Sequence, residues 1–343
     1  MNAAALDRSM EPTAGVETMK AIVQDAYGTA PEEVLRLAEI ARPTIEDGDV
    51  LVRVAAASVD RGTWHLMAGQ PYLIRLVSGL RRPKITNPGH CVAGTIVAIG
   101  KDVTGLAVGD EVFGIADGSF AEYAVARPGK LAPKPASLSF EKAAAVPVSA
   151  LTALQAVRDR GQVQPGQKVL IIGASGGVGT FAVQIAKAFG AEVTGVSSPA
   201  KAELVRSLGA DHVVDYTRED FAGGERRYDV ILDIGGNSKL SHLRRALTPR
   251  GRLVIVGGET DGRWFGGIDR QLRATLLSPL VRQKLGTFVA SENAADLVTL
   301  RDLVDAGKVA PAIDRTYPLD EAAAAVRHVQ DGHARGKVVV TVG

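Results

Sequence analysis

The chain has 343 residues, of which 46% are hydrophobic and 23% charged, and its formal net charge is +2. This length accommodates two ordinary domains, and the nearly balanced charge favours neither nucleic acid nor a membrane surface as a partner. The single cysteine, Cys91, excludes an internal disulfide framework and a four-cysteine zinc lobe. No apolar run reaches the roughly 20 residues that a membrane-spanning helix requires.

The N-terminal segment lacks the features of a secretion signal. Residues 1–18 have neither a basic start nor an apolar core. We therefore expect a disordered extension over residues 1–18, folded structure from about Met19 onward, and a cytoplasmic protein.

The first part of the folded chain predicts a β-rich domain, because short alternating segments are separated by closely spaced turns. Residues 58–69 have no regular pattern but carry many functional side chains. The pattern predicts a small barrel-like or partly open sheet. Strands are expected at 20–24, at 35–40, at 50–57, as a pair within 85–100, after the turn that begins at 109, and at 119–126.

The pattern changes near Ser139. Residues 140–160 are rich in alanine at helical spacing, with one break at Pro147. From Gln167 onward strands and helices alternate, which predicts an α/β fold with a doubly wound parallel sheet. Its strands are expected at 168–173, 191–197, 211–215, 228–234, 251–257 and 284–290.

The C-terminal tail exceeds what a six-stranded nucleotide-binding sheet needs. It predicts a helix at 291–306 with Ser291 as its cap, a strand after Ala312, a helix at 320–331 and a strand at 337–342. We expect the tail to complete the first domain. The predicted division is a β-rich domain at 19–139 plus 291–343, and a nucleotide-binding domain at 140–290.

A glycine-rich turn stands near the middle of the chain. Apolar residues 169–172 indicate a buried strand, and residues 181–189 have helical spacing. Between them the small residues fit Gly-x-x-Gly-x-x-Gly from Gly173 to Gly179, or Ala-x-Gly-x-x-Gly from Ala174 to Gly179. A strand, glycine turn and helix in this order direct backbone N–H groups at a phosphate, so the segment predicts a dinucleotide site.

The end of the second strand of this sheet favours NADPH as the cofactor. NAD-binding proteins place an Asp or Glu there to bind the ribose hydroxyls. This strand instead ends in Ser197 and Ser198, followed by Lys201. Hydroxyls and an ammonium suit a 2′-phosphate. The serines could also cap the following helix, and the two roles are compatible.

Several motifs follow one another in a recognisable order. They are Gly-His-Cys-Val-Ala-Gly at 89–94, Gly-Asp-Glu-Val-Phe-Gly at 109–114, an alanine-rich stretch at 143–153 and Ala-Ser-Gly-Gly-Val-Gly at 174–179. Over residues 19–343 the chain resembles the medium-chain dehydrogenase/reductase superfamily, in its zinc-free quinone oxidoreductase branch. The resemblance implies a GroES-like domain beside a Rossmann domain. It also implies NADPH-dependent reduction of quinones or of the C=C bond of α,β-unsaturated carbonyl compounds in a cleft between the domains.

The same resemblance implies a homodimer, with the sixth-strand edge at 285–290 as the candidate seam. It places a set of residues at the cofactor. They are Ser149 and Thr152 at the nicotinamide side; Ser175, Gly176, Gly177, Val178 and Gly179 in the pyrophosphate turn; Ser197, Lys201 and Tyr216 around the 2′-phosphate; Gly235 and Gly257 beside the nicotinamide half; Phe288 and Val289 near the carboxamide; and Lys337, facing the cofactor from the other domain. For each residue outside the glycine turn, the alternative to a cofactor contact is an ordinary packing or surface position.

A catalytic zinc is not expected. Zinc alcohol dehydrogenases of the superfamily use a Cys, the His of a Gly-His-Glu motif, and a later Cys or Asp. Here Asp60 stands at the first position and His90 at the second, Cys91 replaces the Glu, and residues 146–152 offer no third ligand. Asp60 also departs from the Asn that is common in zinc-free relatives. It is either a cleft carboxylate, protonated or paired with His90 or Arg61, or the cap of a turn.

Candidates for the chemistry lie in residues 60–72, which should face the nicotinamide. Asp60, His65 and Tyr72 are the candidate catalytic residues, since His65 or Tyr72 could donate a proton or a hydrogen bond. Trp64 could form an apolar wall for a flat substrate. A packed Trp and a surface His are the alternatives, and water can also supply the proton.

Three functions stay open. The leading hypothesis is zinc-independent reduction of a quinone or an activated C=C bond by NADPH. The second is an alcohol dehydrogenase or carbonyl reductase with a metal at Asp60 and His90, and the third is a non-catalytic NADPH-binding sensor or RNA-binding protein.

Overall fold

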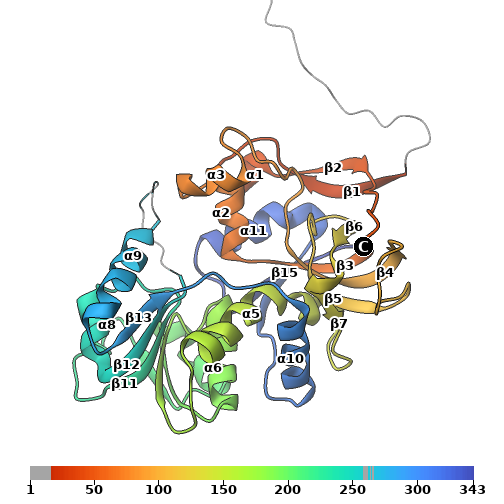
Figure 1. Cartoon of the computed structure of the whole chain (residues 1–343). Helices are drawn as coiled ribbons and strands as arrows, with labels where there is room; N and C mark the ends of the chain where they lie inside the picture. The colour runs from red at the N-terminus through yellow and green to blue at the C-terminus, as the bar shows by residue number, and fades with distance from the viewer. Residues whose placement is uncertain (1–16, 258–261, 263, 265) are drawn as a thin grey trace, which may run out of the picture.

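The computed structural model describes residues 17–257, 262, 264 and 266–343. Most of the predicted N-terminal extension therefore lies outside the described residues. The first strand begins at Thr18, close to the expected start at Met19. Figure 1 shows a β-rich lobe, where both the N-terminal and C-terminal strands lie, beside a second lobe built on a parallel sheet.

The β-rich lobe is organised around β3, which pairs with β15, β4 and β6, all antiparallel. Its seven-stranded sheet has the order β14-β15-β3-β4-β5-β7, with β6 attached to β3. A separate antiparallel pair contains β1 (Thr18–Val23) and β2 (Arg36–Ala41). The sheet strands are β3 (Val50–Val59), β4 (Cys91–Ile99), β5 (Glu111–Ile115), β6 (Tyr123–Ala126), β7 (Leu131–Pro133), β14 (Ile313–Pro318) and β15 (Lys337–Thr341). The C-terminal tail thus supplies two strands of the first sheet.

Three expectations in this lobe were wrong. Residues 58–69 are not irregular, because β3 continues to Val59 and a helix, α2 (Arg61–Ala68), follows. Only one strand lies within 85–100, since the chain before Cys91 includes Pro88 and the left-handed Gly89, with φ 103°. The strand expected at 119–126 begins only at Tyr123.

The second lobe contains a parallel sheet of six strands in the order β10-β9-β8-β11-β12-β13. This is the doubly wound order, which confirms the predicted fold class. Its strands are β8 (Lys168–Ile172), β9 (Glu192–Ser197), β10 (His212–Asp215), β11 (Tyr228–Asp233), β12 (Leu247–Ile255) and β13 (Lys284–Thr287).

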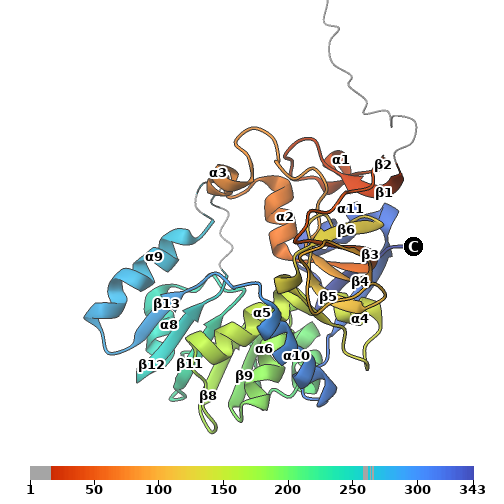
Figure 2. The same ribbon diagram turned by 45° about the vertical axis from the view of Figure 1, so that its right-hand side comes forward.

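Side chains of this sheet are buried on both faces, as a parallel sheet requires. Along β8, Val169 and Ile171 pack into the core shared with α5 and α6, whereas Leu170 and Ile172 pack into the core shared with α8 and α9. Figure 2 shows these helices around the sheet. The four helices are α5 (Pro147–Gln155), α6 (Gly177–Ala188), α8 (Leu240–Ala246) and α9 (Ile268–Leu277). A further short helix, α7 (Ala202–Ser207), follows β9.

The remaining helices cover the β-rich lobe and the seam between the lobes. They are α1 (Pro31–Val34), the 3-10 turn η1 (Tyr72–Ile74), α3 (Arg75–Ser78), α4 (Phe140–Ala144), α10 (Ala294–Asp305) and α11 (Ala322–Gln330). The break expected at Pro147 separates α4 from α5. Among the helices of the described ranges, none is long and apolar enough to cross a bilayer.

Two boundaries near the exit from the parallel sheet differ from the expectation. The strand expected at 284–290 ends at Thr287. The helix expected from Ser291 begins at Ala294, and its cap is Asn293, whose side chain accepts a hydrogen bond from the Asp296 N–H. The backbone of Ser291 instead forms two hydrogen bonds with the side-chain amide of Gln155. The Ser291 N–H donates to Gln155 Oε1, and Gln155 Nε2 donates to the Ser291 carbonyl, so the segment after β13 is held against α5.

Candidate functional site

The glycine turn connects β8 to α6 in the arrangement that the sequence predicts. Gly173 has φ 84°, a left-handed conformation that favours glycine. A Cβ on Gly179 would lie 2.1 Å from the Gly173 carbonyl oxygen, so helix and strand approach too closely for any side chain there. Gly176 precedes the helix without a side-chain cap. The first-turn N–H groups have no acceptor within the helix and can therefore bind an anion.

A pocket of about 410 Å³ opens beside this turn at the carboxyl ends of the parallel strands. This is the position where doubly wound sheets bind their ligands. The pocket brings together four separate segments of the chain: the turn, the end of β9, the end of β10 and the loop after β11. Its lining includes five residues that were expected at the cofactor: Ser175, Ser197, Lys201, Tyr216 and Gly235.

At the expected phosphate end of this pocket, the three predicted side chains differ in exposure. Ser197 is buried, and its hydroxyl donates to the Ser198 carbonyl at 3.2 Å. Tyr216 is 62% exposed. Lys201 Nζ donates to the carbonyls of Gly332, at 3.2 Å, and Ala334, at 2.9 Å, in the other lobe. Burial lowers the pKa of Lys201, although Asp314 acts in the opposite direction.

The seam between the lobes passes directly over the glycine turn. Gly176 forms a parallel bridge with Gly336, just before β15. The next residue, Lys337, is buried, and its Nζ donates to the Val59 carbonyl at 3.2 Å and to Ser149 Oγ at 3.1 Å. A Cβ on Gly177 would lie 3.2 Å from Lys337 Cδ and 3.3 Å from Ser149 Oγ. The structure thus brings Ser149, Lys337 and the turn together at one point.

Other predicted cofactor residues are engaged locally. Thr152 donates its hydroxyl to the Val148 carbonyl within α5. Phe288 is partly buried under Arg160, whose guanidinium lies 5.6 Å from the ring centroid. The side chain of Val289 is 92% exposed. Gly257 N donates to the Asp233 carbonyl at 3.3 Å. Val178 packs against the core beneath the turn.

The sequence did not predict a buried ion pair beneath the loops of this pocket. Arg270 of α9 donates to Asp233 Oδ2 at 2.5 Å and to the Ser238 carbonyl at 3.1 Å, and its second terminal nitrogen donates to the Gly257 carbonyl at 3.1 Å. Burial raises the pKa of Asp233 to about 6, although the Arg270 guanidinium holds it down. Arg270 therefore ties the loop after β11 to the loop after β12.

On the other side of the seam, Asp60 is the N-cap of α2. Its Oδ1 accepts from the Thr63 N–H at 2.9 Å, and the thiol of Cys91 points at its Oδ2 from 4.0 Å. The capping role was one of the two alternatives for Asp60. Arg61 donates to the carbonyls of Val329 and Gln330 on α11.

The remaining candidates for catalysis are held in separate environments. His65 Nδ1 lies 2.8 Å from the Gln70 carbonyl, which can only accept, so this nitrogen carries the ring proton. Trp64 packs edge-on against His65 with 5.0 Å between ring centroids. Tyr72 lies between the guanidinium of Arg75, 4.7 Å from its ring, and Trp264, whose ring centroid is 5.2 Å away.

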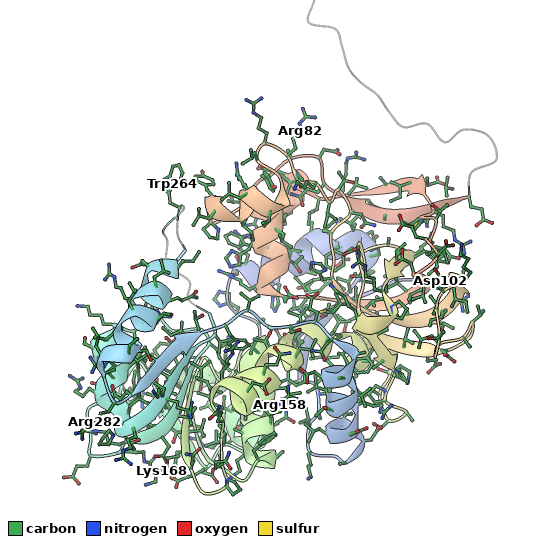
Figure 3. The ribbon with its side chains drawn as sticks, in the orientation of Figure 1. Arg82, Asp102, Arg158, Lys168, Trp264 and Arg282 are labelled. Atoms are coloured by element: carbon green, nitrogen blue, oxygen red, sulfur yellow. The ribbon has the colours of Figure 1, made fainter. Side chains whose placement is uncertain are left out.

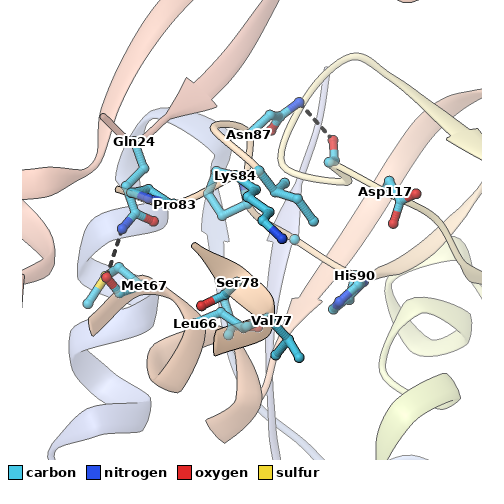
Figure 4. Close-up of a pocket in the computed structure, with 15 residues that line it drawn as sticks. Gln24, Leu66, Met67, Val77, Ser78, Pro83, Lys84, Asn87, His90 and Asp117 are labelled. Atoms are coloured by element: carbon cyan, nitrogen blue, oxygen red, sulfur yellow. Dashed lines mark hydrogen bonds between the residues drawn. The ribbon is translucent and has the colours of Figure 1, made fainter. Parts of the chain in front are cut away.

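A second pocket, of about 250 Å³, lies within the β-rich lobe and has His90 at one end. Figure 4 shows His90 and Asp117 on one side and Gln24 and Met67 on the other. His90 Nδ1 is a buried atom with no hydrogen-bond partner among the described residues. The pocket residues are Gln24, Thr63, Leu66, Met67, Val77, Ser78, Pro83, Lys84, Ile85, Asn87, Pro88, Gly89, His90, Asp117 and Gly118, and do not include Asp60, His65 or Tyr72.

Cys91 is fully buried. Burial raises the pKa of its thiol, and the effect of Lys337 in the opposite direction is smaller. We expect the folded protein to resist N-ethylmaleimide at pH 8, because the protonated, covered thiol is a poor nucleophile. Mass spectrometry should show rapid addition only after unfolding; equal rates in the two states would contradict the burial of this thiol.

The donor set does not fit a catalytic zinc. Asp60 is committed to the cap of α2 and to the Cys91 thiol, and His90 offers one nitrogen. Over residues 17–257, 262, 264 and 266–343, no group of three or more His, Cys, Asp and Glu side chains is placed to hold a metal. A catalytic zinc normally takes three protein ligands. No step of the chemistry is therefore assigned to a metal.

Known proteins resemble this chain over nearly its whole length. A family model described as "Alcohol dehydrogenase GroES-like domain" matches residues 46–136, and one described as "Zinc-binding dehydrogenase" matches residues 208–340. The mouse mitochondrial NAD(P)H oxidoreductase RTN4IP1 is 35% identical, over 94% of this chain and 89% of the relative. The 2-methylene-furan-3-one reductase of Solanum lycopersicum is 32% identical, over 94% of this chain and 79% of the relative.

A solved structure is similar to this chain over the same length. The quinone oxidoreductase of Coxiella burnetii superposes with a TM-score of 0.84 at 29% identity, covering 95% of this chain and all of that one (100%). The chain therefore belongs to the medium-chain dehydrogenase/reductase superfamily.

Proposed function

We propose that this chain is an NADPH-dependent oxidoreductase that reduces quinones or the C=C bond of α,β-unsaturated carbonyl compounds without zinc. One observation carries the proposal: the glycine turn that would hold a dinucleotide lies at the seam, against Gly336 and Lys337 of the β-rich lobe. The names of the relatives, which include NAD(P)H and enone reductases, support the same class of reaction.

The described residues fit a bound dinucleotide. The amides of 177–179, in the first turn of α6, would bind the pyrophosphate, and Ser197, Lys201 and Tyr216 would surround a 2′-phosphate at the other end of the pocket. Ser149 and Lys337 would lie beside the nicotinamide half, with the loops that contain Gly235 and Gly257. When bound, NADPH supplies the hydride.

For the acceptor, we propose the pocket that ends at His90. Its side chains exclude water around an apolar substrate, and the unpartnered Nδ1 of His90 offers a hydrogen bond to a substrate oxygen. Asp60 would position α2 rather than touch the substrate, because its Oδ1 caps that helix. We further propose the division into domains at 19–139 plus 291–343 and at 140–290, and a homodimer that uses the edge strand β13.

A turnover panel tests this function. Purified protein should oxidise NADPH when supplied with quinones, enals or enones, and a chelator should leave the rate unchanged. Metal analysis of the same sample separates this function from a metal-dependent alcohol dehydrogenase or carbonyl reductase. NADPH binding without turnover of any acceptor in the panel would contradict the reductase and favour a sensor.

Replacement of Lys201 by alanine tests the choice between NADPH and NADH. We expect the dissociation constant for NADPH to rise about tenfold or more, because a charge-assisted hydrogen bond to phosphate contributes about 1.5–3 kcal/mol. The constant for NADH should change little. Titration of each nucleotide against this variant, with Arg206→Ala as an exposed control on the neighbouring helix, measures the difference. Equal losses of affinity for both nucleotides would show that Lys201 does not recognise the 2′-phosphate. Its role would then be the contact with the carbonyls of Gly332 and Ala334.

A further inference from the structure

A long stretch of the β-rich lobe contains no acidic residue. From Arg61 to Lys101 there is neither Asp nor Glu, whereas basic residues recur through the stretch. The overall net charge of +2 conceals this local excess because acidic residues lie elsewhere in the chain. The outermost part of the stretch consists of α3 and the loop that follows it.

Exposed apolar and basic side chains are interspersed along this segment. Leu76 is 67% exposed, Val77 71%, Leu80 68% and Ile85 53%, which are high values for large apolar side chains. We call these four residues, together with Arg81 and Arg82 between them, the 76–85 surface. Figure 3 shows Arg82 at the outer tip of the β-rich lobe, pointing away from the protein.

Hydrogen bonds hold the segment in shape from behind. The Lys84 N–H donates to the Ser78 carbonyl at 2.8 Å, and the Tyr27 hydroxyl donates to the Gly79 carbonyl at 2.7 Å. Gly79 has φ 118°, which turns the chain sharply after α3. The side chains of the 76–85 surface are therefore presented outward by a supported turn.

The basic side chains at the tip are uncompensated. Within the part of the chain that the structure describes, no carboxylate lies within ion-pair distance of Arg81, Arg82 or Lys84. Arg75 differs, because it stacks on the Tyr27 ring and donates to the Gly69 carbonyl. Two copies that met through this surface would bring like charges together, so a second copy is a poor occupant.

The 76–85 surface is continuous with the rim of the pocket that ends at His90. Val77 and Ile85 belong to both, and the walls behind them include Leu66, Met67 and Pro83 (Figure 4). An apolar chain that entered this pocket would therefore pass directly over the exposed surface.

We propose that the 76–85 surface docks on an anionic membrane surface, so that a lipid-soluble quinone enters the pocket from the bilayer with its ring toward His90 and its apolar tail over this surface. Exposed apolar side chains beside uncompensated basic ones are the combination that binds an anionic bilayer interface. The docking departs from the expectation drawn from net charge. The choice of quinone rests on the proposed function, whereas the docking does not.

Sedimentation of the full chain with vesicles tests the docking. We expect binding to vesicles of phosphatidylcholine with phosphatidylglycerol, and little binding to phosphatidylcholine alone or at high salt. Each basic residue near such a surface strengthens binding by about fivefold. Reversing two charges in R81E/R82E should therefore weaken binding at least about 25-fold, and L76S/L80S should weaken it as well. None of these four side chains lines the pocket.

The control R206E/R250E makes the same change of net charge at two exposed sites on the other lobe. Its affinity for the anionic vesicles should lie within about twofold of that of the unchanged chain. Failure of the unchanged chain to sediment, or equal losses in R206E/R250E, would overturn the proposal. So would a monomer–dimer shift in R81E/R82E without a change in vesicle binding.

Turnover separates this proposal from the proposed function. R81E/R82E should reduce a water-soluble quinone at the normal rate, but should lose activity on a decyl-tailed quinone carried in anionic vesicles. If the unchanged chain reduces no quinone or enone, the proposed function fails while the sedimentation result still decides the docking. Equal activity of R81E/R82E and the unchanged chain on the vesicle-borne quinone would refute the link between them.

Discussion

Replacing Gly179 by alanine is expected to remove most of the NADPH affinity. The new Cβ would lie 2.1 Å from the Gly173 carbonyl oxygen and 2.8 Å from backbone atoms of Ala174. Backbone atoms of a buried turn cannot move aside as a flexible side chain would, so α6 must shift away from β8. Overpacking of this kind costs about 1–3 kcal/mol in stability. The shift also moves the first-turn amides away from the pyrophosphate.

We expect the dissociation constant for NADPH, measured by titration, to rise about tenfold to a hundredfold in Gly179→Ala if that strain is fully felt in binding. Gly176→Ala is the informative partner, because a Cβ there meets only the Gly173 oxygen, at 3.6 Å. Its fold should remain stable, and any loss of affinity would report on crowding of the ligand alone. Gly129→Ala, where nothing lies within 4 Å, should behave as the unchanged chain. Unchanged affinity in Gly179→Ala would contradict the role of the turn.

Removing the guanidinium of Arg270 is expected to destabilise the nucleotide-binding lobe. Asp233 is fully buried, and Arg270 is the ion-pair partner of its carboxylate. Breaking a buried pair by deleting one partner costs about 3–5 kcal/mol, because the remaining charge stays uncompensated. Urea unfolding of Arg270→Ala should show this loss at neutral pH. The loops that carry Gly235 and Gly257 should loosen, so NADPH affinity should fall too.

The loss in Arg270→Ala should depend on pH in a definite direction. Burial already raises the pKa of Asp233 to about 6 with Arg270 present, and deletion of the guanidinium raises it further. The folded variant then binds a proton that the unfolded chain releases above its ordinary pKa near 4. Its stability should therefore be higher at pH 5 than at pH 8.

Two variants control this experiment. Arg273→Ala removes a largely exposed arginine from the same helix, and should change stability by less than about 1 kcal/mol. The neutral pair D233N/R270Q should recover part of the loss, because no charge is left buried. A loss in Arg270→Ala that is no larger than in Arg273→Ala would show that the pair contributes little.

Local pattern was enough to predict the parallel sheet and its glycine turn. Most strands of the parallel sheet are apolar runs followed by a helical segment, and the turn needs glycine for reasons of space that act within a few residues. The helix α2 was missed although its signals were present: Asp60 is a good N-cap, and Gly69 ends the helix with φ 58°. The helix has only eight residues, too few for a clear apolar period.

The contacts that join distant segments could not be predicted. Asp233 and Arg270 meet because α9 folds back over the ends of β11 and β12, and no local pattern encodes that approach. Lys337 reaches Ser149 across 188 positions of sequence. The exposure of Leu76 and Leu80 could not be predicted from the sequence either, since burial depends on what packs above a residue.

The most direct test of the account is an equilibrium titration of NADPH and NADH into the full chain, followed by nicotinamide fluorescence. The glycine turn, the pocket with Ser197 and Lys201, and the seam at Lys337 together predict saturable binding at one site per chain. NADPH should bind at least about tenfold more tightly than NADH, the difference expected from one charge-assisted hydrogen bond to the 2′-phosphate. No saturable binding of either nucleotide would contradict the account.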